Sequence, residues 1–360
     1  MSLSIGIVGL PNVGKSTLFN ALTNNNILAA NYPFATIEPN TGIIAVPDSR
    51  LAALEKMYGA AKVIPAAVTF VDIAGLVAGA SKGEGLGNKF LANIRECDAI
   101  VHVVRAFENS DVIHVNDQVH PQRDMETINT ELILADLQSI EKHLPKLERE
   151  AKANPAARPQ IEVIKILQEE LQKGTLASEV TSVNTEVIQG LQLLSAKPVI
   201  YLFNVDEETL GNEAKKAELT TLAGKAQSIF VCAKLEEELR GLTEADAQEL
   251  LDAYGVKESG LAQLARAAYH TLGLQSYLTA GPKEVRAWTI RQGSTAPQAA
   301  GVIHTDFEKG FIAAQIVDFD DLMTAGSETA AKAAGKMRTE GRDYVMRPGD
   351  VVEFRFNVSK

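Results

Sequence analysis

The sequence predicts an α/β protein in which a doubly wound parallel sheet is followed by a smaller α+β module. Over the first 277 residues, short apolar and partly β-branched runs alternate with helical segments, as in sheets buried on both faces. A long helical stretch at about 123–196 interrupts this rhythm. From 278 onward, alternating runs are separated by Gly, Pro and Asp, which indicates half-buried strands.

Each element of the parallel sheet follows from a separate apolar run. Strands are expected at 4–8, 68–73, 100–104, 199–204 and 228–231, and a helix is expected at 16–22. In the interrupting stretch, apolar residues spaced four, three, four and three apart mark one face of a helix; they are Ile133, Leu137, Ile140, Leu144 and Leu147. Two prolines in 153–159 break this helix, and the spacing resumes from Ile164. We therefore expect an antiparallel helical hairpin, either as a solvated arm or as a docking surface.

The carboxy-terminal module is expected to combine strands at 285–290, 310–316 and 351–356 with an Ala-rich helix at 327–335. We expect three parts in the chain. Residues 1–122 and 197–277 form a nucleotide-binding domain, 123–196 the hairpin insertion and 278–360 the terminal domain.

Composition excludes several classes of protein. The 360 residues are 46% hydrophobic, without an apolar run of 18 that could span a membrane or a basic leader segment. Two cysteines, Cys97 and Cys232, fit a reducing compartment, so we expect a cytoplasmic protein. The net charge of -11 disfavours a protein that coats nucleic acid through its overall field. All of this charge lies before residue 278, and the neutral remainder has local basic residues such as Lys332, Lys336, Arg338 and Arg342.

A glycine-rich loop predicts nucleotide binding. Residues 9–16 read GLPNVGKS and match G-x-x-x-x-G-K-S/T, with a strand before the loop and a helix after it. The backbone N–H groups of such a loop surround phosphates, and the positive end of the helix favours them. Lys15 is expected to reach the β- and γ-phosphates, and the Ser16 hydroxyl to bind Mg²⁺.

Two further segments fit the γ-phosphate side of such a site. Asp72 begins a D-x-x-G motif at the end of a strand, where the acid can hold Mg²⁺ through water and Gly75 can sense the γ-phosphate. Thr36 lies between this motif and the loop, where translational-type GTPases have a second Mg²⁺ ligand; alternatively it is a surface threonine.

The base-reading segment departs from the N-K-x-D pattern of GTPases. The strand at 199–204 ends in Asn204, Val205 replaces the lysine and Glu207 replaces the aspartate. A longer acid should fit guanine poorly, which predicts relaxed or adenine-leaning selectivity. Cys232 and Ala233 occupy the second base loop, although Cys232 can equally be a buried structural cysteine.

The residue after D-x-x-G is Leu76, where many GTPases have a glutamine that orients the attacking water. Leucine cannot do this. His114 can orient or deprotonate water near neutral pH, and its alternative is a solvated loop histidine.

Together these motifs, with Pro33–Asn40 and the terminal strings around Trp288 and Phe307, resemble the Obg-like ATPase family, YchF subfamily. The resemblance implies a Ras-like P-loop NTPase domain with a helical hairpin insertion and a β-grasp TGS module. It also implies ATP hydrolysis in preference to GTP with Mg²⁺, and binding to the ribosome (50S or 70S) and to RNA through the TGS module and the hairpin.

The same resemblance assigns individual residues. Nucleotide contacts fall on Asn12, Val13, Gly14, Lys15, Ser16, Thr17, Asn204 and Val205, the Mg²⁺ ligands on Ser16 and Thr36, and the catalytic histidine on His114. Some members have a cysteine where this chain has Ala35, so thiol control at that position is not expected. Two alternatives stay open. One is a GTPase of the Obg family, and the other is a nucleotide-gated binding module with incidental hydrolysis.

Overall fold

The computed structural model describes residues 3–24, 40–73, 86–108, 119–155, 158–184 and 190–357. These fall into two compact units. The first contains the described residues of 3–24, 40–43 and 69–264, and the second those of 44–68 and 265–357. No helix of the described residues is both long and apolar enough to cross a bilayer.

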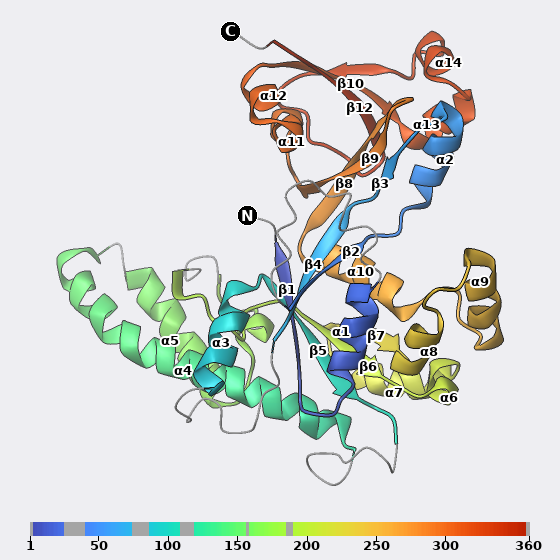
Figure 1. Ribbon diagram of the computed structural model, residues 1–360. Coiled ribbons are helices and arrows are strands. Elements are labelled where there is room, and N and C mark those ends of the chain that lie inside the picture. Colours follow the sequence, from blue (N-terminus) through green and yellow to red (C-terminus); the bar gives the residue numbers. More distant parts are fainter. Residues whose placement is uncertain are drawn as a thin grey trace. The chain divides into compact units, whose positions relative to one another are not determined.

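A six-stranded sheet organises the first unit (Figure 1). Its order is β2-β4-β1-β5-β6-β7, formed by Thr41–Ala45, Ala67–Asp72, Ser4–Gly9, Ala99–Arg105, Val199–Asn204 and Gln227–Val231. The strands from β4 to β7 in this order are parallel, which confirms the five expected strands. Because parallel strands end at one edge, the segments that follow β1, β4, β5, β6 and β7 meet there.

Helices connect these strands, and polar caps fix where several of them begin. The helices are α1 (Lys15–Asn24), α3 (Leu86–Glu96), α6 (Glu207–Leu210), α7 (Glu213–Ala223), α8 (Ala233–Glu238), α9 (Glu244–Ala253) and α10 (Gly260–Thr271), the last of which continues into the second unit. The side chains of Asp206, Asn212 and Thr243 accept backbone N–H groups at the starts of α6, α7 and α9.

The expected helical hairpin is present. Helix α4 (Pro121–Ala153) and helix α5 (Arg158–Gln172) lie side by side (Figure 1), followed by a short 3₁₀ turn, η3 (Ala177–Glu179). The predicted apolar stripe packs into one cluster with α5, in which Ile133 and Ile140 are buried. The fully buried Asp136 accepts the N–H groups of Leu194 and Ser195, both at 2.8 Å, so α4 is fixed to the chain that enters β6.

The second unit is built on a mixed sheet of order β11-β10-β12-β8-β9-β3. Its strands are Arg338–Glu340, Phe311–Asp318, Asp350–Phe356, Leu274–Ala280, Val285–Arg291 and Val63–Ile64 in that order. The helices are α2 (Ser49–Tyr58), α11 (Ala296–Ile303), α12 (Thr305–Lys309), α13 (Phe319–Ala325) and α14 (Glu328–Ala333). Tyr277, Ile290 and Phe311 form part of its core. The strands and the helix expected after residue 278 are therefore present.

One segment lies in a different unit from the one that the sequence suggested. Residues 44–68 were assigned to the nucleotide-binding domain, but they cluster with the carboxy-terminal unit. The reason is that β3 pairs in parallel with β9 at the edge of the second sheet, and α2 contacts β8 and β9. A strand of only two residues is too short to show the alternation of apolar and polar positions, so the sequence pattern does not indicate β3. Strand β8 also begins at Leu274, before the expected boundary at 278.

A buried glutamate makes the stability of the first unit depend on pH. Glu236 of α8 is 5% exposed and accepts the N–H groups of Gly260 (2.6 Å) and Leu261 (3.4 Å) at the start of α10. Burial raises the pKa of Glu236 to about 7. The folded protein therefore binds more protons than the unfolded chain between about pH 4.5 and pH 7, and its stability falls as the pH rises through this window.

We expect Glu236→Gln to remove this loss, because glutamine keeps an acceptor for Gly260 without the buried charge. The decrease in the free energy of unfolding from pH 5 to pH 8 should become smaller by up to about 3 kcal/mol. Urea unfolding at both pH values measures this decrease in the free energy of unfolding. Glu237→Gln, at the exposed neighbouring position, is the control and should leave the decrease unchanged. Equal pH dependence in Glu236→Gln and the wild type would contradict the assignment.

Candidate functional site

The loop between β1 and α1 has the backbone shape of an anion site. Asn12 and Gly14 adopt left-handed conformations, with φ of 64° and 91°. A Cβ atom on Gly14 would lie 2.2 Å from Asn204 Nδ2, and one on Gly9 would lie 2.9 Å from the Val103 carbonyl oxygen. Both motif glycines are therefore required by close approach, and Gly14 also by its backbone conformation. The loop ends at the start of α1, where unpaired N–H groups favour phosphate.

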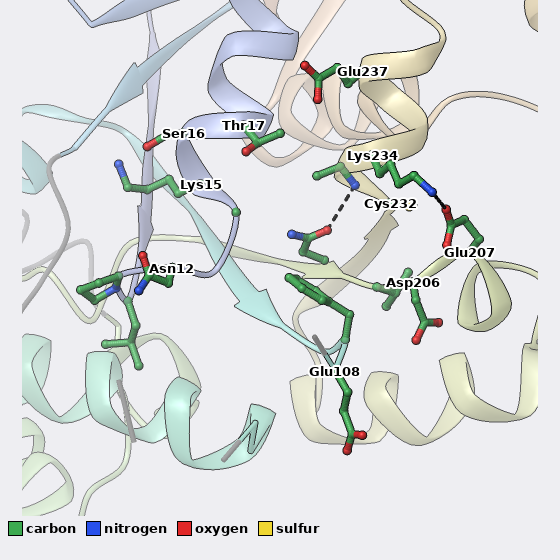
Figure 2. A pocket seen from close by; sticks show the side chains of 17 residues that line it. Asn12, Lys15, Ser16, Thr17, Glu108, Asp206, Glu207, Cys232, Lys234 and Glu237 are labelled. Atoms are coloured by element: carbon green, nitrogen blue, oxygen red, sulfur yellow. Dashed lines mark hydrogen bonds and ion pairs between the residues drawn. The ribbon is translucent and has the colours of Figure 1, made fainter. Parts of the chain in front are cut away.

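This loop borders a cavity of about 890 Å³ at the carboxyl edge of the sheet (Figure 2). Its lining comes from the β1–α1 loop, the chain after β5 and the segments that follow β6 and β7. The lining residues are Leu10, Pro11, Asn12, Gly14, Lys15, Ser16, Thr17, Phe107, Glu108, Asn204, Val205, Asp206, Glu207, Cys232, Ala233, Lys234 and Glu237. The volume is in the range of small-molecule sites.

One end of the cavity is suited to phosphates. Lys15 and Ser16 lie together there, away from Glu207 and Lys234 at the other end (Figure 2). The Lys15 ammonium forms an ion pair with the carboxylate of Asp72, the last residue of β4. The two side chains are only 10% and 20% exposed. The sequence-predicted acid thus lies beside the phosphate-binding lysine, although it does not line the cavity itself.

Asn204 joins the phosphate loop to the second base loop. Its Nδ2 donates to the Val13 carbonyl oxygen at 2.9 Å, and its Oδ1 accepts the Ala233 N–H at 3.2 Å. The residue is 3% exposed, and Val13 itself is buried beneath the loop instead of lining the cavity. The carboxamide predicted to contact the base therefore has both of its polar atoms bonded within the protein framework.

The two acids that follow Asn204 also have protein partners. Asp206 caps α6, since its Oδ1 accepts the Thr209 N–H at 2.8 Å. Glu207 forms an ion pair of 2.8 Å with Lys234, drawn as a dashed line in Figure 2. The hydrogen bond from Lys234 lowers the pKa of the Glu207 carboxyl. Both acids of the base-reading segment are thus held in place by interactions inside the protein.

Cys232 and Ala233 line the same end of the cavity. Cys232 is 4% exposed and packs in a cluster with Val205 and Leu235, and burial raises the pKa of its thiol. Its side chain is therefore a protonated packing group, while the Ala233 N–H holds Asn204. The structure brings these two residues to the position that the sequence predicted.

Some predicted residues lie outside the described residues, and some lining residues were missed. Thr36, Gly75, Leu76 and His114 belong to the first group. The missed residues include Phe107, Glu108 and Glu237. Phe107 could have been found, because it lies three residues after the strand predicted at 100–104, and parallel strands end at the same edge.

The chain is similar to known proteins along its whole length. Residues 4–136 match the family model described as "50S ribosome-binding GTPase". Residues 274–357 match a model for the carboxy-terminal region of YchF GTPases, described as "Protein of unknown function (DUF933)". The chain is 51% identical to the "Ribosome-binding ATPase YchF" of Pasteurella multocida and 49% identical to those of Bacillus subtilis and Escherichia coli O157:H7. In each case 99% of this chain and 100% of the relative are covered.

A solved structure agrees with the fold. The Schizosaccharomyces pombe YchF GTPase superposes with a TM-score of 0.88 at 40% identity and covers 98% of both chains. The predicted fold class is confirmed: an α/β P-loop NTPase domain with a helical insertion, followed by a carboxy-terminal sheet domain.

We expect Gly14→Ala to weaken nucleotide binding by about tenfold or more, because the methyl group strains a left-handed residue and displaces Asn204 from Val13. Titration calorimetry with ATP measures this loss. Gly59→Ala is the matched control, since φ there is 60° and no atom lies within 4 Å of the added carbon. If Gly14→Ala bound ATP as tightly as the control, the role given to this close approach would be wrong.

Proposed function

The chain belongs to the YchF family, and on that premise we propose that it is a cytoplasmic, Mg²⁺-dependent ATPase that hydrolyses ATP in preference to GTP and binds the ribosome through the 50S subunit. Its P-loop GTPase domain makes it a nucleotide hydrolase. The choice of ATP and the partner are proposals. So are the hairpin insertion at 123–196, the terminal domain at 278–360 and the nucleotide-binding domain at 1–122 and 197–277, from which residues 44–68 are left out.

One observation carries the preference for ATP: both acids of the base-reading segment are engaged by the protein. Guanine is selected when a carboxylate accepts its N1–H and 2-amino groups. Here Asp206 caps a helix and Glu207 is paired with Lys234. One oxygen of each carboxylate is already engaged, so the two donors of guanine would compete with these contacts, whereas adenine offers no such donor pair. The site therefore lacks the arrangement that gives strong discrimination for guanine.

At the other end, the residues present fit a nucleotide-borne Mg²⁺. The Ser16 hydroxyl and the Asp72 carboxylate are hard oxygen donors, and Mg²⁺ usually keeps waters and phosphate oxygens as its other ligands. Among the described residues no group of three or more His, Cys, Asp or Glu forms an independent metal cage. When bound, the ion would neutralise the charge that develops on the phosphates during hydrolysis. An incoming phosphate competes with Asp72 for Lys15, which frees the carboxylate to act through water.

Hydrolysis needs an oriented water in addition to bound phosphates. With Leu76 in place of glutamine, we assign this role to His114, contact with the γ-phosphate to the Gly75 N–H, and the second Mg²⁺ ligand to Thr36. These assignments rest on the sequence motifs alone.

The ribosome proposal rests on the names of the relatives, and contacts to RNA through the carboxy-terminal unit and the hairpin are part of it. Most of the basic residues that the sequence analysis named in that unit already have partners within the protein. Lys336 pairs with Asp321 at 3.0 Å, Arg338 lies 3.6 Å from Asp350, and Arg342 donates to the Phe311 carbonyl oxygen. This set alone is therefore a weak phosphate-binding patch.

We expect ATP to bind at least about tenfold more tightly than GTP in the presence of Mg²⁺, because guanine must compete with Thr209 or Lys234 for a carboxylate acceptor and adenine need not. Calorimetric titration of both nucleotides measures the ratio. Glu207→Gln should change the ATP affinity by less than about twofold, since that carboxylate serves Lys234 and not the base. Equal affinities, or tighter binding of GTP, would favour the GTPase alternative.

Single-turnover hydrolysis of ATP with and without ribosomes separates an enzyme from a nucleotide-gated binding module. We expect slow turnover in isolation, because Leu76 cannot orient water, and faster turnover with ribosomes. Lys15→Ala should abolish both rates by removing the phosphate-binding ammonium. Undetectable turnover under both conditions would contradict the enzyme proposal and favour incidental hydrolysis.

A further inference from the structure

We propose that Arg105 is a positioning residue that fixes the ring of Phe107 as one wall at the base end of the nucleotide cavity, with Asp124 of α4 as its counter-charge. The inference rests on the proposed ATP binding and deepens it. It assigns a role in base binding to a buried arginine that belongs to none of the predicted sequence motifs, and it links that role to the helical hairpin.

The contacts between Arg105 and Phe107 are of two kinds. The guanidinium carbon lies over the phenyl ring, 4.5 Å from its centroid, and Arg105 Nε donates to the Phe107 carbonyl oxygen at 3.2 Å. One side chain thus holds both the ring and the peptide group of the same residue. A cation over an aromatic face is attractive, and more so when water is excluded. Since Arg105 is only 1% exposed, the interaction is largely shielded from solvent.

The backbone places this ring beside the base-reading strand. Arg105 ends β5 in register with Asn204 of β6, and the Ala106 N–H donates to the Asn204 carbonyl oxygen at 2.8 Å. Phe107 follows directly and lines the cavity together with Asn204 and Val205. With the guanidinium over the ring, the remaining surface of Phe107 is presented to the cavity, where it offers an aromatic contact to a nucleobase.

Packing alone does not require an arginine at this position. Arg105 is among the largest fully buried side chains, and burial lowers the pKa of its guanidinium, while the charge of Asp124 opposes that effect. Asp124 is itself 1% exposed. Burying two charges usually costs more free energy than filling the same volume with apolar groups. Unlike an aliphatic residue, arginine provides a planar cation with a directed N–H donor at this position.

The pair also reaches into the hairpin. Asp124 lies in the first turn of α4, and its neighbour Met125 packs in the same cluster as Val205. Since α4 also contacts β5, the first turn of the long helix is part of the surroundings of Arg105.

The test compares ATP with inorganic tripolyphosphate, which binds the phosphate loop but has no base. Arg105→Lys keeps the charge opposite Asp124 and removes the planar face and the Nε donor. We expect its ATP affinity to fall about fivefold and its tripolyphosphate affinity to change by less than about twofold. Phe107→Ala should weaken ATP binding by about tenfold. In the Phe107→Ala background, Arg105→Lys should add less than about twofold, because its effect runs through the ring.

Three results would overturn the proposal: unchanged ATP affinity in Arg105→Lys, an equal loss for both ligands, or the full loss persisting in Phe107→Ala. If Arg105→Lys does not fold, Asp124→Asn carries the same test, since it keeps the arginine and the shape of its partner. Failure of the proposed ATP preference shows separately, in the wild-type ATP and GTP titrations. The non-additivity of the two substitutions is readable with either nucleotide.

Discussion

The hydrogen bonds of the Asn204 carboxamide are the interaction on which the rest of the site depends. By donating to Val13 and accepting from Ala233, this side chain connects the loops that follow β1 and β7, whose strands are not neighbours in the sheet. It also explains why residue 14 must be glycine, since the amide nitrogen occupies the space a Cβ would need. A buried amide left without hydrogen-bond partners is costly. The two loops and β6, the strand that ends in Asn204, are therefore constrained together.

Other buried polar side chains of the first unit are also satisfied by partners within the protein. Asp136 is satisfied by the chain entering β6, Glu236 by the start of α10, and Arg105 by a carbonyl oxygen, an aromatic ring and a facing carboxylate. Asp136 and Glu236 each join segments that are distant in sequence, whereas Arg105 holds a residue two positions away that lines the cavity. Buried polar groups, which cost free energy unless bonded, thus fix the relative placement of these elements.

Much of the site could be predicted from the sequence because its chemistry is local. The phosphate loop is a contiguous run with a defined spacing, so Gly14, Lys15 and Ser16 were identified directly. Asp206 and Glu207 show the limit of this reasoning. Their residue types suggested a modified base reader, but the helix cap and the ion pair with Lys234 depend on where α6 and α8 lie. Phe107 belongs to no sequence motif. It lines the cavity because it lies just after the end of β5.

The sequence by itself determined the fold class, the parallel strands, the hairpin and the phosphate-binding motif, because periodicity and motif spacing are properties of neighbouring residues. Only the tertiary structure decided that residues 44–68 cluster with the carboxy-terminal unit, since β3, which joins its sheet, is recognisable solely by its pairing with β9. It likewise decided that Asn204 serves the framework and that Arg105 lies behind Phe107. The physical reason is that hydrogen bonds and ring contacts between distant segments depend on distance and burial, which residue order does not encode locally.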